Sequence, residues 1–228
     1  MEIIKCPLCG KEVSEKAVKC VHCGLELIPN NTERKNMSPK DLFIRACAYY
    51  DHLITNIKII GRAIETNDKI KFSTNKALME IDYILQYILL KQAMIDGDID
   101  SNEIQFIQKI SEHGDLMNLI YDKLNLKLKW SDLKIYKTKV LESVLKVIFS
   151  NIIDMVIDFI FNIAAFDAVY KKENFYVIFR KDFLNIAECL SYVDSDMSDN
   201  EGHKLFDYIF GDLYLKRKKE IETKIGGS

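Results

Sequence analysis

The sequence predicts a mainly α-helical protein that begins with a small cysteine-rich module. All three prolines of the 228-residue chain lie within its first 39 residues, so proline interrupts no later helix. Apolar residues make up 48% of the chain and recur at helical spacing from residue 39 onward. Four of the six cysteines lie within residues 6–23. The chain therefore divides into a short N-terminal part and a long helical part.

The four N-terminal cysteines form two pairs with the spacing C-x2-C-x10-C-x2-C, namely Cys6 with Cys9 and Cys20 with Cys23. A two-residue gap lets both thiolates of a pair reach one metal ion, and the glycine after each pair frees the backbone to turn toward the sulfurs. Over residues 3–26 the pairs resemble the knuckles of the short zinc-ribbon family. Four thiolates close a tetrahedral site with no position for a catalytic water, so we expect one structural Zn²⁺. Disulfides or an iron centre are the alternatives for the same residues.

Residues 27–38 are polar and lack periodicity, which indicates a linker after the ribbon. The predicted divisions are a zinc ribbon at 1–27, a linker at 28–38, a helical domain at 39–222 and a flexible tail at 223–228. The ribbon is too short to bury a stabilising core, so metal binding is expected to supply its folding energy.

The sequence also predicts a cytoplasmic protein. No apolar targeting segment opens the chain, since Glu2 follows the first methionine directly. The longest apolar stretch, 147–166, contains Asp154 and Asp158, and each carboxylate at bilayer depth costs about 2.5–3.5 kcal/mol. We therefore expect no transmembrane segment.

Seven to eight helices are expected after the linker. Ser38 and Pro39 form a favourable helix start, with serine as the N-cap and proline in the first turn. Apolar periodicity then predicts helices at 39–64, 75–95, 100–110, 116–124, 131–166, 173–193 and 199–220. Ser131 and Asp132 are the expected cap of the longest stretch, and a break near residues 150–151 would divide it in two.

The stretch 131–166 is apolar on nearly all sides, which is typical of a central helix surrounded by its neighbours. Its polar residues recur every four positions and predict a narrow solvated stripe along the helix. The stripe consists of Glu142, Lys146, Ser150, Asp154, Asp158 and Asn162.

An acidic turn with the pattern D-x-D-[IM]-x-x-N-E occurs twice, beginning at Asp96 and, 98 residues later, at Asp194. In the first copy Asp100 is the expected N-cap of the next helix, and Glu103 completes a capping box with it. The second copy repeats this arrangement. Neither copy has the glycine and the glutamate that an EF-hand loop requires at its sixth and twelfth positions, so neither is a standard Ca²⁺ site.

The first turn and the apolar helix before it resemble the tellurite-resistance TerB-like family, whose helical domains carry acidic D-G-x-[IV]-x-x-x-E turns in two related halves. The match spans roughly residues 39–222, and in the second copy Ser195 stands where the motif has glycine. The resemblance implies a stress- or defence-linked role in bacteria and six candidate functional acids. They are Asp96, Asp98, Glu103, Asp194, Asp196 and Glu201. The acids either only cap helices or also hold a second divalent cation or a partner.

Charge and motifs favour a non-enzymatic adaptor or accessory subunit with protein partners. The chain has neither a nucleotide-binding glycine loop nor a G-x-S-x-G element. With 32 basic and 34 acidic residues it is not a general polyanion binder, so nucleic acid is not favoured as a partner. The basic run 216–219 suits a solvated helix end, with peripheral contact to lipid or nucleic acid as its alternative. The competing functions are a nucleic-acid-associated zinc-ribbon factor and a divalent-metal sensor built on the acidic turns.

Overall fold

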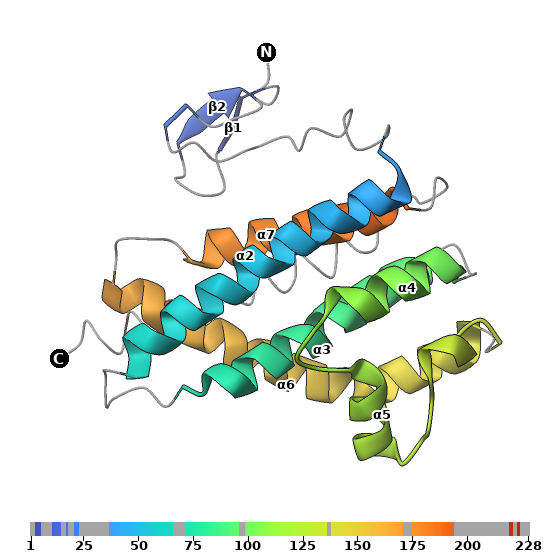
Figure 1. Ribbon diagram of the computed structural model, residues 1–228. Helices are drawn as coiled ribbons and strands as arrows, with labels where there is room; N and C mark the ends of the chain where they lie inside the picture. Colours follow the sequence, from blue (N-terminus) through green and yellow to red (C-terminus); the bar gives the residue numbers. More distant parts are fainter. Residues whose placement is uncertain are drawn as a thin grey trace.

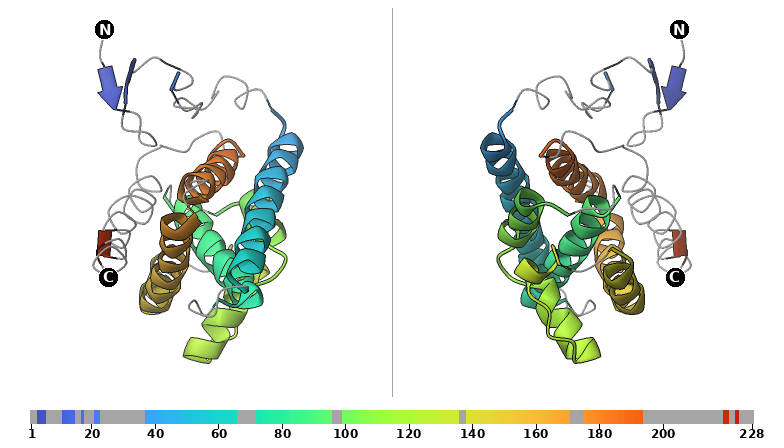
Figure 2. Two further views of the ribbon diagram at one scale, coloured as in Figure 1. Left: turned by 90° about the vertical axis from the view of Figure 1, so that its left-hand side faces the viewer. Right: turned by 90° about the vertical axis from the view of Figure 1, so that its right-hand side faces the viewer.

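The structure is a computed structural model, shown in Figure 1 and, from two further sides, in Figure 2. It describes residues 3–5, 11–14, 17, 21–22, 37–65, 72–95, 99–135, 138–170, 175–193, 219–220 and 223. The mainly helical class is confirmed. Six α-helices lie within the described ranges, fewer than the seven to eight predicted. Of the predicted helix at 199–220, only residues 219–220 lie within these ranges, and both are helical; most of the basic run lies outside them.

Two short strands form an antiparallel pair near the N-terminus. They are β1 (Ile3–Lys5) and β2 (Glu12–Ser14), with Ile4 opposite Val13. The strands flank the first cysteine pair in the sequence. The four predicted zinc ligands, Cys6, Cys9, Cys20 and Cys23, lie outside the described residues.

Apart from the start of α6, the described helices begin and end close to the predicted residues. They are α2 (Pro39–Glu65), α3 (Thr74–Ala93), α4 (Ser101–Ile110), α5 (Leu116–Leu124), α6 (Thr138–Tyr170) and α7 (Phe175–Ser191). At the start of α2 the Oγ atom of Ser38 accepts a hydrogen bond from the amide of Asp41 at 3.2 Å, which confirms the predicted N-cap.

The predicted start of the longest helix is wrong. Residues Trp130–Asp132 form a separate 3₁₀ turn, η1, and α6 begins only at Thr138. The Oδ2 atom of Asp132 accepts a hydrogen bond from the amide of Lys129 at 3.2 Å, so this aspartate closes the 3₁₀ turn. The break considered near residues 150–151 is also absent, because α6 continues through both residues.

The central helix is α3, whereas the sequence favoured α6. Fourteen of the twenty residues of α3 are buried, and α2, α4, α5, α6 and α7 all contact it. Helix α6 packs against α3, α5 and α7 but leaves the side chains of Val140, Val147 and Phe161 about half exposed. The predicted polar stripe of α6 is solvated from Glu142 to Asp158. No helix in the described ranges is both long and apolar enough to cross a membrane.

Helix α7 is held between α2 and α6, and it lies alongside α2 in Figure 1. Two edge-to-face ring pairs join α6 to α7: Phe159 with Phe179 at 5.2 Å between centroids, and Phe166 with Phe175 at 4.9 Å. The buried carboxylate of Asp167, near the end of α6, accepts a hydrogen bond from the amide of Phe175 at 2.9 Å. This bond satisfies one of the free amides at the start of α7.

Two buried polar side chains of α3 hold the turn between α4 and α5. The Oδ2 atom of Asp82 accepts hydrogen bonds from the amides of His113 and Gly114 at 2.6 and 2.8 Å. One helical turn later, Gln86 accepts from the amide of Leu116 at 2.6 Å and donates to the carbonyl of Gly114 at 3.3 Å. We call these contacts the α3 clamp. They fix the start of α5 against the central helix.

Replacing Gly114 with alanine is expected to destabilise the fold by about 1–3 kcal/mol, because an added Cβ would lie 2.9 Å from the carbonyl oxygen of Met79. Backbone atoms of the central helix cannot move aside cheaply. Urea denaturation followed by circular dichroism measures the loss. Glu112→Ala, at an exposed side chain of the same turn, should stay within about 0.5 kcal/mol of the wild type. Equal stability of Gly114→Ala and the wild type would contradict the close packing.

Candidate functional site: a cleft beside Trp130

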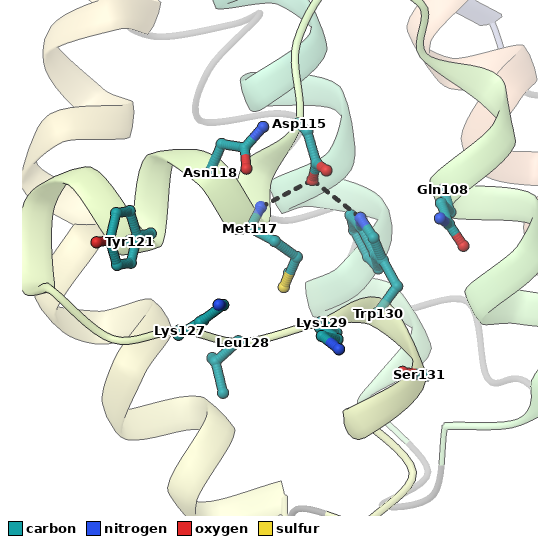
Figure 3. A pocket seen from close by; sticks show the side chains of 10 residues that line it. All are labelled: Gln108, Asp115, Met117, Asn118, Tyr121, Lys127, Leu128, Lys129, Trp130 and Ser131. Atoms are coloured by element: carbon teal, nitrogen blue, oxygen red, sulfur yellow. Dashed lines mark hydrogen bonds between the residues drawn. The ribbon is translucent and has the colours of Figure 1, made fainter.

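A cleft of about 670 Å³ opens between α4, α5 and the segment that leads from α5 to η1 (Figure 3). Helix α4 contributes Gln108 and α5 contributes Met117 and Tyr121. Residues 127–131 form the opposite wall, where Trp130 faces Asp115. Four of the ten lining residues are apolar or aromatic and six are polar or charged, so the cleft is more polar than a typical small-molecule pocket.

Trp130 is anchored at the end of the cleft by a hydrogen bond. Its side chain is 5% exposed, and its indole Nε1–H donates to the Oδ1 atom of Asp115 at 2.9 Å. The same oxygen accepts a hydrogen bond from the amide of Met117 at 2.9 Å, so Asp115 is also the N-cap of α5. Because the α3 clamp holds the residues on either side of Asp115, the position of the indole is tied to the central helix.

The wall that follows α5 includes extended backbone, since Lys129 has φ −121° and ψ 152°. Asn125 ends α5 in the left-handed region with φ 52°, and its amide donates to the carbonyl of Tyr121 at 2.7 Å. Exposure then alternates along the chain: Lys127 and Lys129 are exposed, whereas Leu128 and Trp130 are buried. Alternation with a period of two is typical of an extended chain.

The backbone of this segment lacks partners within the part of the chain that the structure describes. The amides and carbonyls of residues 126–128 make no hydrogen bond to any described residue. Backbone polar groups are paired in most folded proteins, with the chain, with water or with a ligand. Residues 127 and 128 line the cleft, so a ligand bound there would lie next to backbone donors and acceptors that have no partner among the described residues.

The charges that line the cleft are two ammonium groups and one carboxylate. Lys127 and Lys129 make no ion pair with any described residue, so both charges face solvent. The carboxylate of Asp115 accepts the indole and amide hydrogen bonds already described. The charged groups left to contact a ligand are thus the two lysines.

The first predicted acidic turn is described only in part. Its capping box is confirmed: the amide of Asp100 donates to Glu103 Oε2 at 2.9 Å, and the amide of Glu103 donates to Asp100 Oδ1 at 2.8 Å. Glu103 is 0% exposed. The other five candidate acids, Asp96, Asp98, Asp194, Asp196 and Glu201, lie outside the described residues, as do the four predicted zinc ligands. Among the described residues no group of three or more His, Cys, Asp and Glu side chains could hold a metal ion.

A second polar cluster joins α2 to α7 away from the cleft. His52 Nδ1 lies 2.8 Å from the Oδ2 atom of Asp182, and the side-chain amide of Asn56 lies 3.3 Å from His52 Nε2. Burial raises the pKa of Asp182 to about 6, although the hydrogen bond with His52 and the nearby Lys181 oppose the shift. The unfolded chain releases this proton near pH 4. The folded state therefore binds more protons between about pH 4 and pH 6.

The stability of the helical domain is expected to fall as the pH rises from 4 to 6, because Asp182 must then ionise in a buried site. Asp182→Asn should remove up to about 3 kcal/mol of this pH dependence. Urea denaturation of both proteins at pH 4 and pH 7, followed by circular dichroism, measures the difference. Burial also raises the pKa of Asp82, so a smaller slope should remain in the variant. An unchanged slope would contradict the role of Asp182.

Comparison of the chain with protein-family models, with curated proteins and with solved structures finds no match. Sequence reasoning missed the cleft, although two signals pointed to it. Trp130 is the only tryptophan in the chain, and residues 126–130 alternate apolar and basic residues as Leu-Lys-Leu-Lys-Trp.

Proposed function

We propose that this protein is a non-enzymatic adaptor whose helical domain binds a partner protein in the Trp130 cleft. The observation that carries the proposal is a cleft in which backbone groups and two lysines, all without a partner among the described residues, lie beside an indole held by a hydrogen bond. These groups can donate and accept hydrogen bonds, attract negative charge and bury apolar surface. Such a combination serves recognition of another chain.

The anchoring of the cleft also favours recognition. The wall formed by α5 begins at a turn that is hydrogen-bonded to Asp82 and Gln86 of α3. The opposite wall, residues 127–131, is joined to that turn by the hydrogen bond between Trp130 and Asp115. A surface that is already ordered loses little conformational entropy when it binds. The cleft can therefore bind a partner without rearrangement of the helices.

The second part of the proposal concerns the N-terminal module. The four-cysteine pattern supports a ribbon that holds one structural Zn²⁺ and presents a second small surface. The stress- or defence-linked setting rests on the TerB-like resemblance alone. Two binding surfaces on one chain would let the protein join two partners in one complex.

Affinity purification of the full chain from its native host tests the proposal. The wild type should retain a protein in stoichiometric amount after nuclease treatment. Lys127→Glu/Lys129→Glu should lose this protein, because the two introduced carboxylates would repel the negative charge of the partner that the lysines attract. Lys139→Glu/Lys146→Glu is the matched control, since it makes the same charge change at exposed lysines of α6. Retention by the cleft variant, or equal loss from both variants, would contradict the proposal.

A further inference from the structure

We infer that the cleft binds an acidic, extended segment of the partner, which pairs as a strand with the backbone of residues 126–128. The inference rests on the proposed function, because it names the chemistry of the partner at the same cleft. Three features support it: the unpaired backbone, the spacing of the two lysines, and the apolar surface around them.

The unpaired backbone favours an extended ligand. A strand rises by about 3.3 Å per residue, so residues 126–128 span about 10 Å of backbone that is not paired with any described residue. A second extended chain placed along this edge would receive two or three main-chain hydrogen bonds. Addition of a peptide strand to an exposed edge is a common mode of recognition, in which the backbone provides affinity and the alternate side chains provide specificity.

The two lysines favour an acidic ligand. Lys127 and Lys129 are two residues apart in an extended segment, so their side chains leave it on the same side, about 7 Å apart at the backbone. A strand that carries carboxylates at alternate positions has the same spacing. The one carboxylate in the lining, that of Asp115, already accepts two hydrogen bonds from the protein. A basic segment would meet two like charges here.

The rim of the cleft favours apolar residues between the acids. Tyr121, which lines the cleft, is 49% exposed, and Leu126, the neighbour in sequence of the lining residue Lys127, is 37% exposed. Both would lose contact with water if a peptide covered the edge. The expected ligand therefore alternates acidic and apolar residues.

Titration of the full-length, zinc-loaded protein by ¹⁵N NMR tests the inference. The probe is a pool of capped eight-residue peptides with glutamate at alternate positions and a mixture of valine, leucine and phenylalanine at the others. The chain has one tryptophan, so a single indole resonance reports on the cleft. We expect the acidic pool to shift this resonance and the amide resonances of residues 126–128. Lys127→Glu/Lys129→Glu should weaken binding roughly tenfold or more, and Lys139→Glu/Lys146→Glu should leave it unchanged.

Three comparisons can overturn the inference. Equal binding of a pool with lysine in place of glutamate would rule out charge recognition. Equal binding of an acidic pool with N-methylated backbone amides would rule out strand pairing. If the acidic pool shifts no resonance of the cleft, the inference that the ligand is an acidic peptide is wrong. If Lys127→Glu/Lys129→Glu still loses the partner protein in that last case, the proposed function stands and only the class of ligand is wrong.

Discussion

Replacing Asp82 with alanine is expected to lower the free energy of unfolding of the helical domain by about 3–5 kcal/mol. The Asp82 side chain is 0% exposed. It accepts hydrogen bonds from the Tyr50 hydroxyl at 2.8 Å and from the amides of His113 and Gly114. Alanine would leave these donors buried without an acceptor. Urea denaturation followed by circular dichroism measures the loss.

Two further variants make this prediction specific. Asp82→Asn keeps one acceptor oxygen and should lose less, roughly 1–3 kcal/mol. Asp154→Ala removes an exposed carboxylate from α6 and should stay within about 0.5 kcal/mol of the wild type. Because the clamp positions Asp115, Asp82→Ala should also weaken capture of the partner protein under conditions where it remains folded. A loss no larger than that of Asp154→Ala would contradict the clamp.

Serine at both Cys6 and Cys9 is expected to reduce bound zinc from one ion per chain to a small fraction. Two of the four thiolates of a tetrahedral site would be missing, and structural Zn²⁺ sites contribute about 10–16 kcal/mol of binding free energy. The ribbon should then unfold, while the unfolding transition of the helical domain stays unchanged. Inductively coupled plasma mass spectrometry gives the zinc content, and circular dichroism gives the helical transition.

Cys47→Ser is the matched control for the zinc prediction. Cys47 lies half-buried on α2, and burial and the nearby carboxylates of Asp51 and Glu112 raise the pKa of its thiol. This variant should retain its zinc. Zinc retained by the double serine variant would rule out the four-cysteine site. Loss of the helical transition together with the zinc would show that the ribbon and the helical domain fold as one unit.

Local signals predicted the helices well, because each signal acts within a few residues. Ser38 caps α2, and Asp100 and Glu103 form the predicted capping box of α4. Such contacts depend on sequence neighbours alone. The prediction that α6 starts at Ser131 was wrong for a related reason. Ser131 and Asp132 have side chains suited to capping a helix, but both residues belong to the 3₁₀ turn η1.

The position of each helix in the bundle could not be read from its own composition. Helix α6 is the more apolar sequence, yet α3 is the central helix, because which faces meet depends on all the connections together. The geometry of the cleft depends on contacts between residues that are far apart in the sequence. Asp82 and His113 lie 31 residues apart, and their hydrogen bond decides where Asp115 and then Trp130 are placed. The alternation in residues 126–130 indicates an extended segment but gives no sign of the helices that face it.

Site-specific photo-cross-linking in the native host tests the central claim most directly, because it asks which surface of the helical domain contacts a partner. A benzophenone amino acid would replace Tyr121 at the cleft in one protein and Val147 on the exposed side of α6 in another. The two side chains are 49% and 58% exposed, so both probes are accessible. We predict a single cross-linked partner protein from position 121 and none from position 147. Cross-links from position 147 alone would contradict the cleft and place the partner on α6.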